Sequence, residues 1–353
     1  MKRLLIGLLK FGVSAAIIAY LVSKAVGDKT FTDLADRPKN WGVLVAALAA
    51  CLIATLISFV RWKMLVRAVG IPLALRDALR LSFLGYLLNF VSPGSVGGDL
   101  FKAVFLVREH PTQRGAAIAS VLADRVIGLF SLMLLCSGAI LLFGQLHAPN
   151  EVVRDICWAV LGCTLAGATG VAVLLWPGFT QGSLARWLRT SSRLGPMFNS
   201  LLTAVERYRA RPRVLVIGTL ASVCVHVFST LSIYLVARGI PGHVPSLADH
   251  FIIAPLSMLA AAMPFAFGGL GAFEGSFDLL YVYVPVGEAF KGSEGLIVAL
   301  GFRVITILIA LIGAGYYLTG RREVSRVWSE AQRDEVGPAG EQILISSTEG
   351  ALT

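Results

Sequence analysis

Residues 90–102 read FVSPGSVGGDLFK, a short polar break between two strongly apolar stretches of the chain. Proline and paired glycines interrupt helices, and Asp99 adds a carboxylate close to that interruption. About 13 residues (79–91) precede the break and about ten follow it. At 1.5 Å per residue neither part crosses a hydrocarbon layer of roughly 30 Å. The stretch therefore predicts a re-entrant hairpin of two helices over residues 78–108, with a kinked full crossing as the alternative.

The composition places the rest of the chain in a bilayer. Of the 353 residues 56% are hydrophobic and 15% charged, with a mean hydropathy of +0.76, whereas about 25% of residues are charged in a typical soluble domain. Six apolar segments are long enough to span the hydrocarbon core. Their approximate bounds are residues 4–26, 41–60, 120–146, 152–176, 213–237 and 295–318. The prediction is an all-α polytopic membrane protein with one transmembrane domain (1–319) and a disordered cytoplasmic tail (320–353).

A second broken apolar region, residues 251–285, repeats the pattern of the first. SPGSVGGD (92–99) and MPFAFGGL (263–270) both place Gly-Gly after a proline, and an Arg-Val-Ile sequence follows each within a later span. The matching positions are Pro93, Gly97, Gly98 and Arg125 in the first half, and Pro264, Gly268, Gly269 and Arg303 in the second. The second hairpin would enter the membrane from the opposite side. Six transmembrane helices and two re-entrant broken-helix hairpins in an inverted repeat are therefore predicted.

The basic residues indicate how the chain is oriented. With a cytoplasmic N-terminus, the inner segments and the two tails hold 21 of the 31 Lys and Arg, and the outer segments hold seven. This bias favours cytoplasmic N- and C-termini in the cytoplasmic membrane. Trp41, Trp62 and Trp176 are expected at membrane interfaces. The arginine-rich loop 177–213 has apolar residues at helical spacing, which indicates an amphipathic segment held by anionic lipid of the inner leaflet. A solvated connector is the alternative.

The interrupted helices create conditions for binding an anion. Unwound backbone at mid-depth must face a polar cavity, and a restarting helix directs its positive N-terminal end there. Six ionisable residues lie beside these breaks: Asp99, Lys102, Asp124, Arg125, Glu274 and Arg303. The predicted substrate-binding set adds Asn89, Ser92, Gly97, Gly98, Gly268 and Gly269, with Pro93, Gly94, Pro264 and Gly271 as structural hinges.

Each charged residue also has a structural interpretation. The two arginines suit phosphate because a guanidinium offers planar, bidentate donors. They could instead form ion pairs, Arg125 with Asp99 and Arg303 with Glu274. Asp99 and Glu274 could cap helices, bind a cationic headgroup or carry a proton. Lys102 is expected to snorkel to the inner surface, while Asp124 could pair with another span.

Several classes of function are not expected. The five cysteines form no CxxC pair and the five histidines show no ligand spacing, so neither a metal site nor a disulfide framework is predicted. No phosphate-binding GxxxxGK[ST] loop occurs, so ATP hydrolysis and nucleotide cofactors are not predicted. Nucleic acid is not an expected partner, because the basic residues that give the net charge of +10 flank the apolar spans.

Four motifs together resemble a known family. LLNFVSPGSVGGDLFKA (87–103), DRVIGL (124–129), GGLGAFEG (268–275) and GFRVI (301–305) are similar to the transmembrane domain of lysylphosphatidylglycerol synthases and flippases. That family includes stand-alone members and the flippase half of multiple peptide resistance factors. The resemblance implies lipid translocation carried by intramembrane charges, which correspond here to Asp99, Asp124, Arg125, Glu274 and Arg303.

This chain also departs from the family pattern. Family members often carry basic residues where this chain has Ser95 and Phe273, which affects headgroup selectivity. Only a short polar tail follows residue 319, so lysine transfer to lipid is not predicted.

The predicted function is that of a lipid flippase or scramblase for an anionic or polar-headgroup lipid. The alternative is a membrane enzyme or accessory subunit acting on polyprenyl-phosphate, hopanoid or glycolipid substrates. No catalytic residue is assigned, and the oligomeric state, including a possible homodimer, is left open.

Overall fold

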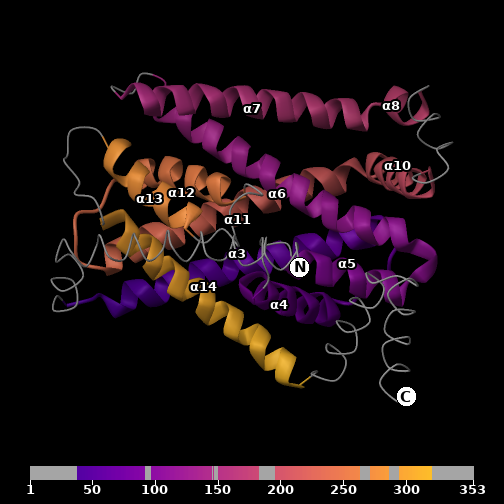
Figure 1. Ribbon diagram of the computed structural model, residues 1–353, viewed down its shortest axis with the longest axis horizontal. Coiled ribbons are helices and arrows are strands. Elements are labelled where there is room, and N and C mark those ends of the chain that lie inside the picture. The colour runs from indigo at the N-terminus through magenta and orange to yellow at the C-terminus, as the bar shows by residue number, and fades with distance from the viewer. Residues whose placement is uncertain are drawn as a thin grey trace, which may run out of the picture.

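The structure, a computed structural model, describes residues 38–91, 97–144, 146, 150–182, 195–262, 271–285 and 294–319. Within these ranges the chain is helical and contains no strand. The elements are α3 (Trp41–Ala68), α4 (Leu75–Val91), α5 (Gly97–Glu109), η2 (Pro111–Gln113), α6 (Arg114–Leu142), α7 (Glu151–Leu175), α8 (Pro177–Gln181), α10 (Gly195–Arg209), α11 (Pro212–Gly239), α12 (Leu247–Ala262), α13 (Ala272–Tyr283) and α14 (Glu294–Thr319) (Figure 1).

Five of the described helices are long and apolar enough to cross a membrane. They are α3, α6 together with η2, α7, α11 and α14, and they coincide with five of the six predicted spans. The all-α, multi-pass membrane architecture is therefore confirmed for the described part of the chain. The first predicted span (4–26) and the predicted disordered tail (320–353) lie outside the described residues.

The predicted span 41–60 ended too early. Helix α3 runs on to Ala68, so Arg61 and Trp62 lie inside it and are only 6% and 1% exposed. The expectation of an interfacial Trp62 is therefore wrong. In the sequence, Arg61 looked like the end of an apolar span. In the structure its charge is compensated by Asp124 of α6. Trp41 and Trp176, by contrast, are 70% and 67% exposed.

Helices α3 and α11 pack antiparallel along their whole length. At one end the Asn40 N–H donates to the Gly239 carbonyl (3.0 Å), and further along the Ser232 hydroxyl donates to the Ala47 carbonyl (2.8 Å). Gly239 allows this approach, because a Cβ there would lie 2.7 Å from the Leu44 side chain. This pair of helices forms one wall of the bundle on which the shorter helices are assembled.

The shorter helices form two pairs at opposite ends of the bundle. Figure 1 shows α4 and α5 toward the end where α10 lies, and α12 and α13 toward the other end. Helix α5 is described from Gly97 onward, and α13 begins directly after Gly271. Gly271 has φ of +84°, a backbone conformation that favours glycine. The intervening residues 92–96 and 263–270 are outside the described part of the chain.

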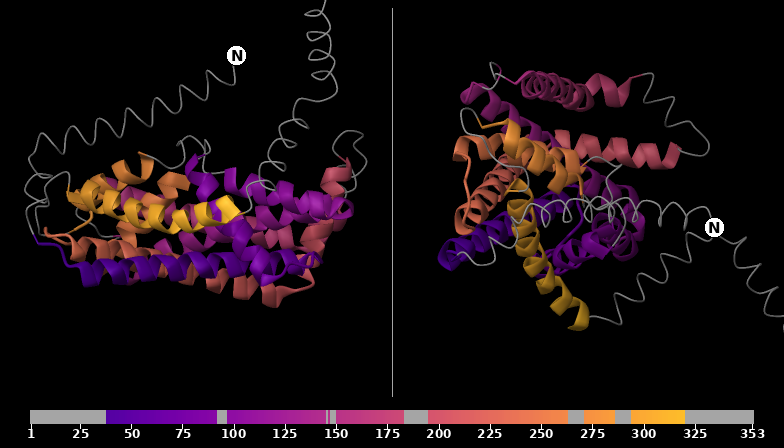
Figure 2. Two further views of the ribbon diagram at one scale, coloured as in Figure 1. Left: turned by 90° about the horizontal axis from the view of Figure 1, so that it is seen from below. Right: turned by 60° about the vertical axis from the view of Figure 1, so that its left-hand side comes forward.

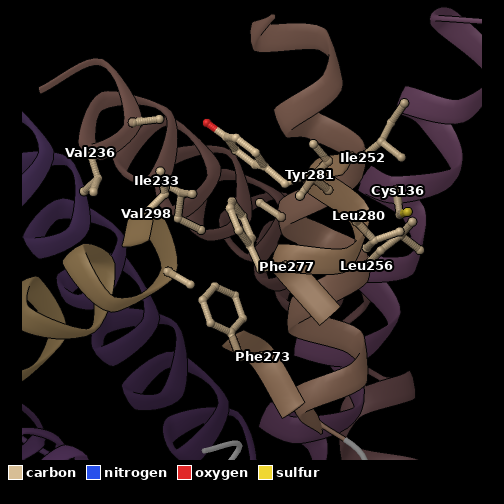
Figure 3. Close-up of a cluster of buried hydrophobic side chains, with 14 of the residues drawn as sticks. Cys136, Ile233, Val236, Ile252, Leu256, Phe273, Phe277, Leu280, Tyr281 and Val298 are labelled. Carbon is tan, nitrogen blue, oxygen red and sulfur yellow. The ribbon is translucent and has the colours of Figure 1, made fainter. Parts of the chain in front are cut away.

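Aromatic side chains fix α13 in the core. Phe273, Phe277 and Tyr281 recur every four residues along one face of α13 and are at most 5% exposed. Figure 3 shows them among side chains of α11, α12 and α14, including Ile233, Ile252 and Val298. Such spacing places all three rings on one helix face, so α13 is held by apolar contacts on the side that faces the bundle.

Helices α7 and α10 lie at the periphery. Helix α7 packs mainly on α6 and stands apart from the rest of the bundle in two views (Figures 1 and 2). The apolar face of α10 is buried against protein, and Tyr208 donates a hydrogen bond to the Leu65 carbonyl at 3.1 Å. This part of the basic segment 177–213 is therefore docked on the bundle through its apolar residues, not laid on lipid through them.

The close approach of α4 and α5 depends on Gly98. A Cβ at this position would overlap the backbone carbonyl of Gly85 and lie 2.9 Å from Asn89 Oδ1. We expect Gly98→Ala to destabilise the protein by about 1–3 kcal/mol, as overpacked sites do, and to lower its melting temperature in detergent. Gly162→Ala on α7 is the control, because a Cβ there meets no atom within 4 Å. Equal melting temperatures for the two variants would contradict the described crossing.

Candidate functional site

A polar cavity of about 480 Å³ lies between α3, α4, α5, α6 and α11, with the end of α12 at its edge. Ten polar or ionisable side chains line it: Ser58, Arg61, Ser82, Tyr86, Asn89, Asp99, Lys102, Asp124, Arg125 and His226. Apolar side chains such as Phe59 and Leu132 complete the wall. The cavity brings together five of the predicted site residues, namely Asn89, Asp99, Lys102, Asp124 and Arg125.

Asp99 is the ionic centre of this cavity. It is the third residue of α5, and its carboxylate accepts a hydrogen bond from Arg125 Nε on α6. Its other oxygen lies 3.8 Å from the Lys102 ammonium. The Asp99 side chain is 13% exposed, whereas that of Arg125 is 49% exposed. The Arg125–Asp99 ion pair, one of the alternatives that the sequence allowed, is therefore present, and the Arg125 guanidinium is accessible.

Lys102 points into the protein. The residue is 9% exposed, and its Nζ lies 4.9 Å from the centroid of the Trp62 ring and 6.0 Å from that of Phe59. The expectation that Lys102 snorkels to the membrane surface is wrong. The Asp99 carboxylate and two aromatic faces stabilise the ammonium inside the bundle, so a position near the surface offers no advantage.

Asp124 pairs with Arg61 on another helix. Arg61 Nε donates to Asp124 Oδ1 at 2.9 Å, and Arg61 Nη1 donates to the Ser222 hydroxyl of α11 at 2.5 Å. This interaction joins three long helices. Sequence reasoning missed Arg61, although the apolar residues Met64, Leu65 and Val66 that follow it indicated that the helix continues.

Asn89 satisfies a backbone N–H near the start of α5. Its Oδ1 accepts a hydrogen bond from the Gly98 N–H at 2.9 Å, and this N–H has no partner within the first turn of α5. Gly97 and Gly98 are themselves buried. Gly98 lies against the Gly85 backbone and the Asn89 side chain, and so positions the start of α5 against α4.

The second ionic pair is buried and fully engaged. Glu274, the third residue of α13, is 1% exposed and accepts hydrogen bonds from Arg303 Nε (2.8 Å) and Nη2 (2.5 Å) on α14. Its other oxygen accepts from the Gly271 N–H at 2.8 Å. The alternatives of ion pairing and helix capping therefore both apply to Glu274. Glu274 and Arg303 do not line the polar cavity.

The two pairs occupy equivalent places in the two halves of the chain. Each carboxylate is the third residue of the helix that follows an interruption, and each partner is the arginine of an Arg-Val-Ile sequence in a later helix. They differ in exposure, since the Arg125 side chain is 49% exposed and that of Arg303 is 21% exposed. Of the two pairs, Asp99–Arg125 lines the polar cavity.

An apolar cavity of about 270 Å³ lies on the neighbouring face of α6. Leu122, Val126 and Phe130 of α6 line it together with side chains of α7, α10 and α11. Val126 also lines the polar cavity, so the two cavities adjoin. Sequence reasoning did not find this second cavity, because no motif indicates which helices lie beside α6.

The other predicted site residues, Ser92, Pro93, Gly94, Pro264, Gly268 and Gly269, lie outside the described part of the chain. Among the residues that are described, no group of three or more His, Cys, Asp and Glu is placed to hold a metal ion. His226 lies within the wall of the cavity, and its Nε2 is hydrogen-bonded to the Gly128 carbonyl at 3.0 Å.

Residues 7–313 match the lysylphosphatidylglycerol synthase TM region family. The chain belongs to this family. The match covers both helix pairs, both ionic pairs and almost all of the long described helices. The chain is also similar to a UPF0104 membrane protein of Methanothermobacter thermautotrophicus, with 23% identity over 305 residues, which are 81% of this chain and 87% of that protein. Membership indicates a lipid-related function in a membrane.

Removing one partner of the Arg61–Asp124 pair should destabilise the fold. Both side chains are at most 13% exposed, and an uncompensated buried charge costs about 3–5 kcal/mol. We expect Arg61→Gln to lower the melting temperature in detergent clearly. The control is Arg154→Gln, which removes an exposed pair with Glu151 (3.6 Å) worth at most about 1 kcal/mol. A melting temperature for Arg61→Gln that matches the control would contradict the structural role of this pair.

Proposed function

We propose that this protein moves an anionic or polar-headgroup lipid between the leaflets of the cytoplasmic membrane, as a flippase or scramblase. The observation that carries the proposal is the adjoining pair of cavities on α6. One is lined by five charged side chains and a histidine, the other almost entirely by apolar side chains, and they share Val126. The polar cavity suits the charged headgroup of a lipid, and the adjoining apolar cavity suits an acyl chain of the same lipid. A small water-soluble anion would need only the polar cavity.

The path across the membrane would use both halves of the chain. We propose that α4 and α5, and likewise α12 and α13, are re-entrant hairpins of an inverted repeat that includes six transmembrane helices. Support comes from their positions at opposite ends of the bundle and from the equivalent placement of Asp99 and Glu274. Short helices from the two ends would together supply polar groups at a depth that neither end reaches alone.

The proposed first step is a competition between two anions for Arg125. The half-exposed Arg125 guanidinium contacts Asp99, and Asp99 has a second cation, Lys102, at 3.8 Å. A lipid phosphate entering the cavity could therefore take a share of Arg125 without leaving the Asp99 carboxylate unpaired. The N-terminal end of α5, with Gly97 and Gly98, adds a favourable dipole for the same anion.

The buried pair of the second half would act as the opposite gate. Separating Glu274 from Arg303 without a replacement would cost about 3–5 kcal/mol. A phosphate that replaces Glu274 on Arg303 would compensate this loss, so the pair would open mainly when a headgroup is present. In this proposal, transport needs no covalent step, and the carboxylates hold cations instead of acting as nucleophiles or bases.

The basic residues near α10 support a proposal for the orientation. We propose that this end of the bundle faces the cytoplasm. The exposed side chains of Arg207 and Arg213 there would contact anionic lipid of the inner leaflet. Arg61 and Lys102 are buried in the protein, so they no longer count among the basic residues of the cytoplasmic side. That side still has more Lys and Arg than the outer side.

Arg125 provides the clearest test of the proposed function. We expect Arg125→Gln to slow the movement of fluorescent phospholipid between leaflets of reconstituted vesicles by about tenfold or more, because a hydrogen bond to a charged group contributes about 1.5–3 kcal/mol. Stability should change little, since Asp99 keeps Lys102 as its partner. The control is Arg154→Gln. Equal rates for wild type and Arg125→Gln would reject this role, and no movement by wild type would reject the function.

Filling the apolar cavity should also slow transport. Leu122→Trp would occupy space between α6 and α7, whereas Leu141→Trp, on the same helix and 61% exposed, does not line the cavity. We expect the first variant to reduce lipid movement several-fold and the second to leave it unchanged. Two equally active tryptophan variants would show that this cavity does not accommodate the acyl chain.

A further inference from the structure

Two buried polar side chains on the α4–α5 wall of the polar cavity lack a close acceptor. Lys102 has its ammonium 3.8 Å from Asp99 Oδ1, which is longer than a direct charged hydrogen bond. Ser82 is 0% exposed and lines the same cavity, and its hydroxyl has no hydrogen-bond partner within the part of the chain that the structure describes. Buried polar groups in native proteins normally have partners. Both groups therefore indicate an acceptor that a ligand supplies.

The described charges of the cavity do not cancel. Three cationic side chains, Arg61, Lys102 and Arg125, line it with two carboxylates, Asp99 and Asp124. Counting His226 as neutral leaves an excess of one positive charge, and a protonated His226 would add to it. The sequence segments that interrupt the two helix pairs, 92–96 and 263–270, contain no ionisable residue. One negative charge on the ligand would balance this excess.

Both carboxylates are already engaged. Asp124 is bonded to Arg61, and Asp99 is shared between Arg125 and Lys102. A cationic group on a lipid headgroup would therefore have to compete with an arginine or a lysine for either carboxylate. It would also approach Arg125 and Lys102, whose charges repel it more strongly in a low-dielectric interior than in water. The cavity is thus unfavourable for a headgroup that carries an amine.

We infer that the polar cavity selects lipids whose headgroup carries net negative charge, and that Lys102 and Ser82 set this selectivity by donating to the headgroup phosphate. The inference rests on the proposed function and names the lipid class within it: a phosphodiester lipid without an amine is accepted, a zwitterionic lipid less well, and an aminoacylated cationic lipid least. Lys102 and Ser82 are thus specificity-determining residues of the same cavity.

The transport test compares three lipids in one assay. Vesicles containing the full chain would carry fluorescent phosphatidylglycerol, phosphatidylethanolamine or lysylphosphatidylglycerol, and movement would be resolved by leaflet. We expect phosphatidylglycerol to move fastest. Lys102→Met should lower the ratio of its rate to that of phosphatidylethanolamine by about tenfold, Ser82→Ala by a few-fold, and Lys102→Arg should retain most of it. Equal rates for the three lipids in wild type, or an unchanged ratio in Lys102→Met, would overturn the inference.

A binding test separates this inference from the proposed function. The melting temperature of the purified full chain would be measured with dihexanoyl phosphatidylglycerol, its phosphatidylethanolamine counterpart and the chain-free headgroup glycerophosphoglycerol. Selective stabilisation by the anionic lipid, reduced in Lys102→Met and Ser82→Ala, would support the inference even if no lipid crossed the vesicle membrane. Stabilisation by the chain-free headgroup alone would indicate a soluble anion as ligand, and equal stabilisation by both lipids would overturn the inference.

Discussion

An ionised side chain inside a bilayer must have a partner, and this requirement organises both halves of the protein. Asp99 and Glu274 occupy the third position of a helix that follows an interruption, and each holds an arginine of a later, longer helix. A third pair, Arg61–Asp124, joins α3 to α6. The short helices are therefore fixed by charge as well as by packing, and the cavity lies where one of these pairs stays accessible.

The sequence predicted features governed by local chemistry. Long apolar runs and the proline and glycine interruptions located most helices, because membrane thickness and backbone geometry act on each segment separately. The pairing of Asp99 with Arg125 was among the alternatives, since the repeated motif placed both residues beside similar breaks. The predictions for Lys102 and Trp62 were wrong for a shared reason. Their side chains pack against distant partners, such as Trp62 and Phe59 for Lys102, and no local pattern encodes those partners.

The two halves of the repeat are chemically alike but differ in accessibility. Arg125 faces a cavity, while Glu274 is buried with both oxygens hydrogen-bonded. In the proposed mechanism this difference has a physical meaning: one pair can exchange its carboxylate for a headgroup, and the other resists opening without a replacement. The apolar cavity beside Val126 would keep the acyl chain out of the polar region during that exchange.

The central claim is that the cavity beside Arg125 is polar and open to water within the membrane. Cysteine labelling tests it most directly, using a cysteine-free chain in native membranes with Ser58→Cys, which lines the cavity, or Val60→Cys, which is exposed on α3 but does not line it. We predict that a charged, water-soluble thiol reagent labels Cys at position 58 and that added anionic short-chain lipid slows the labelling, while position 60 stays unlabelled. An unreactive position 58, or equal labelling of both positions, would contradict the account.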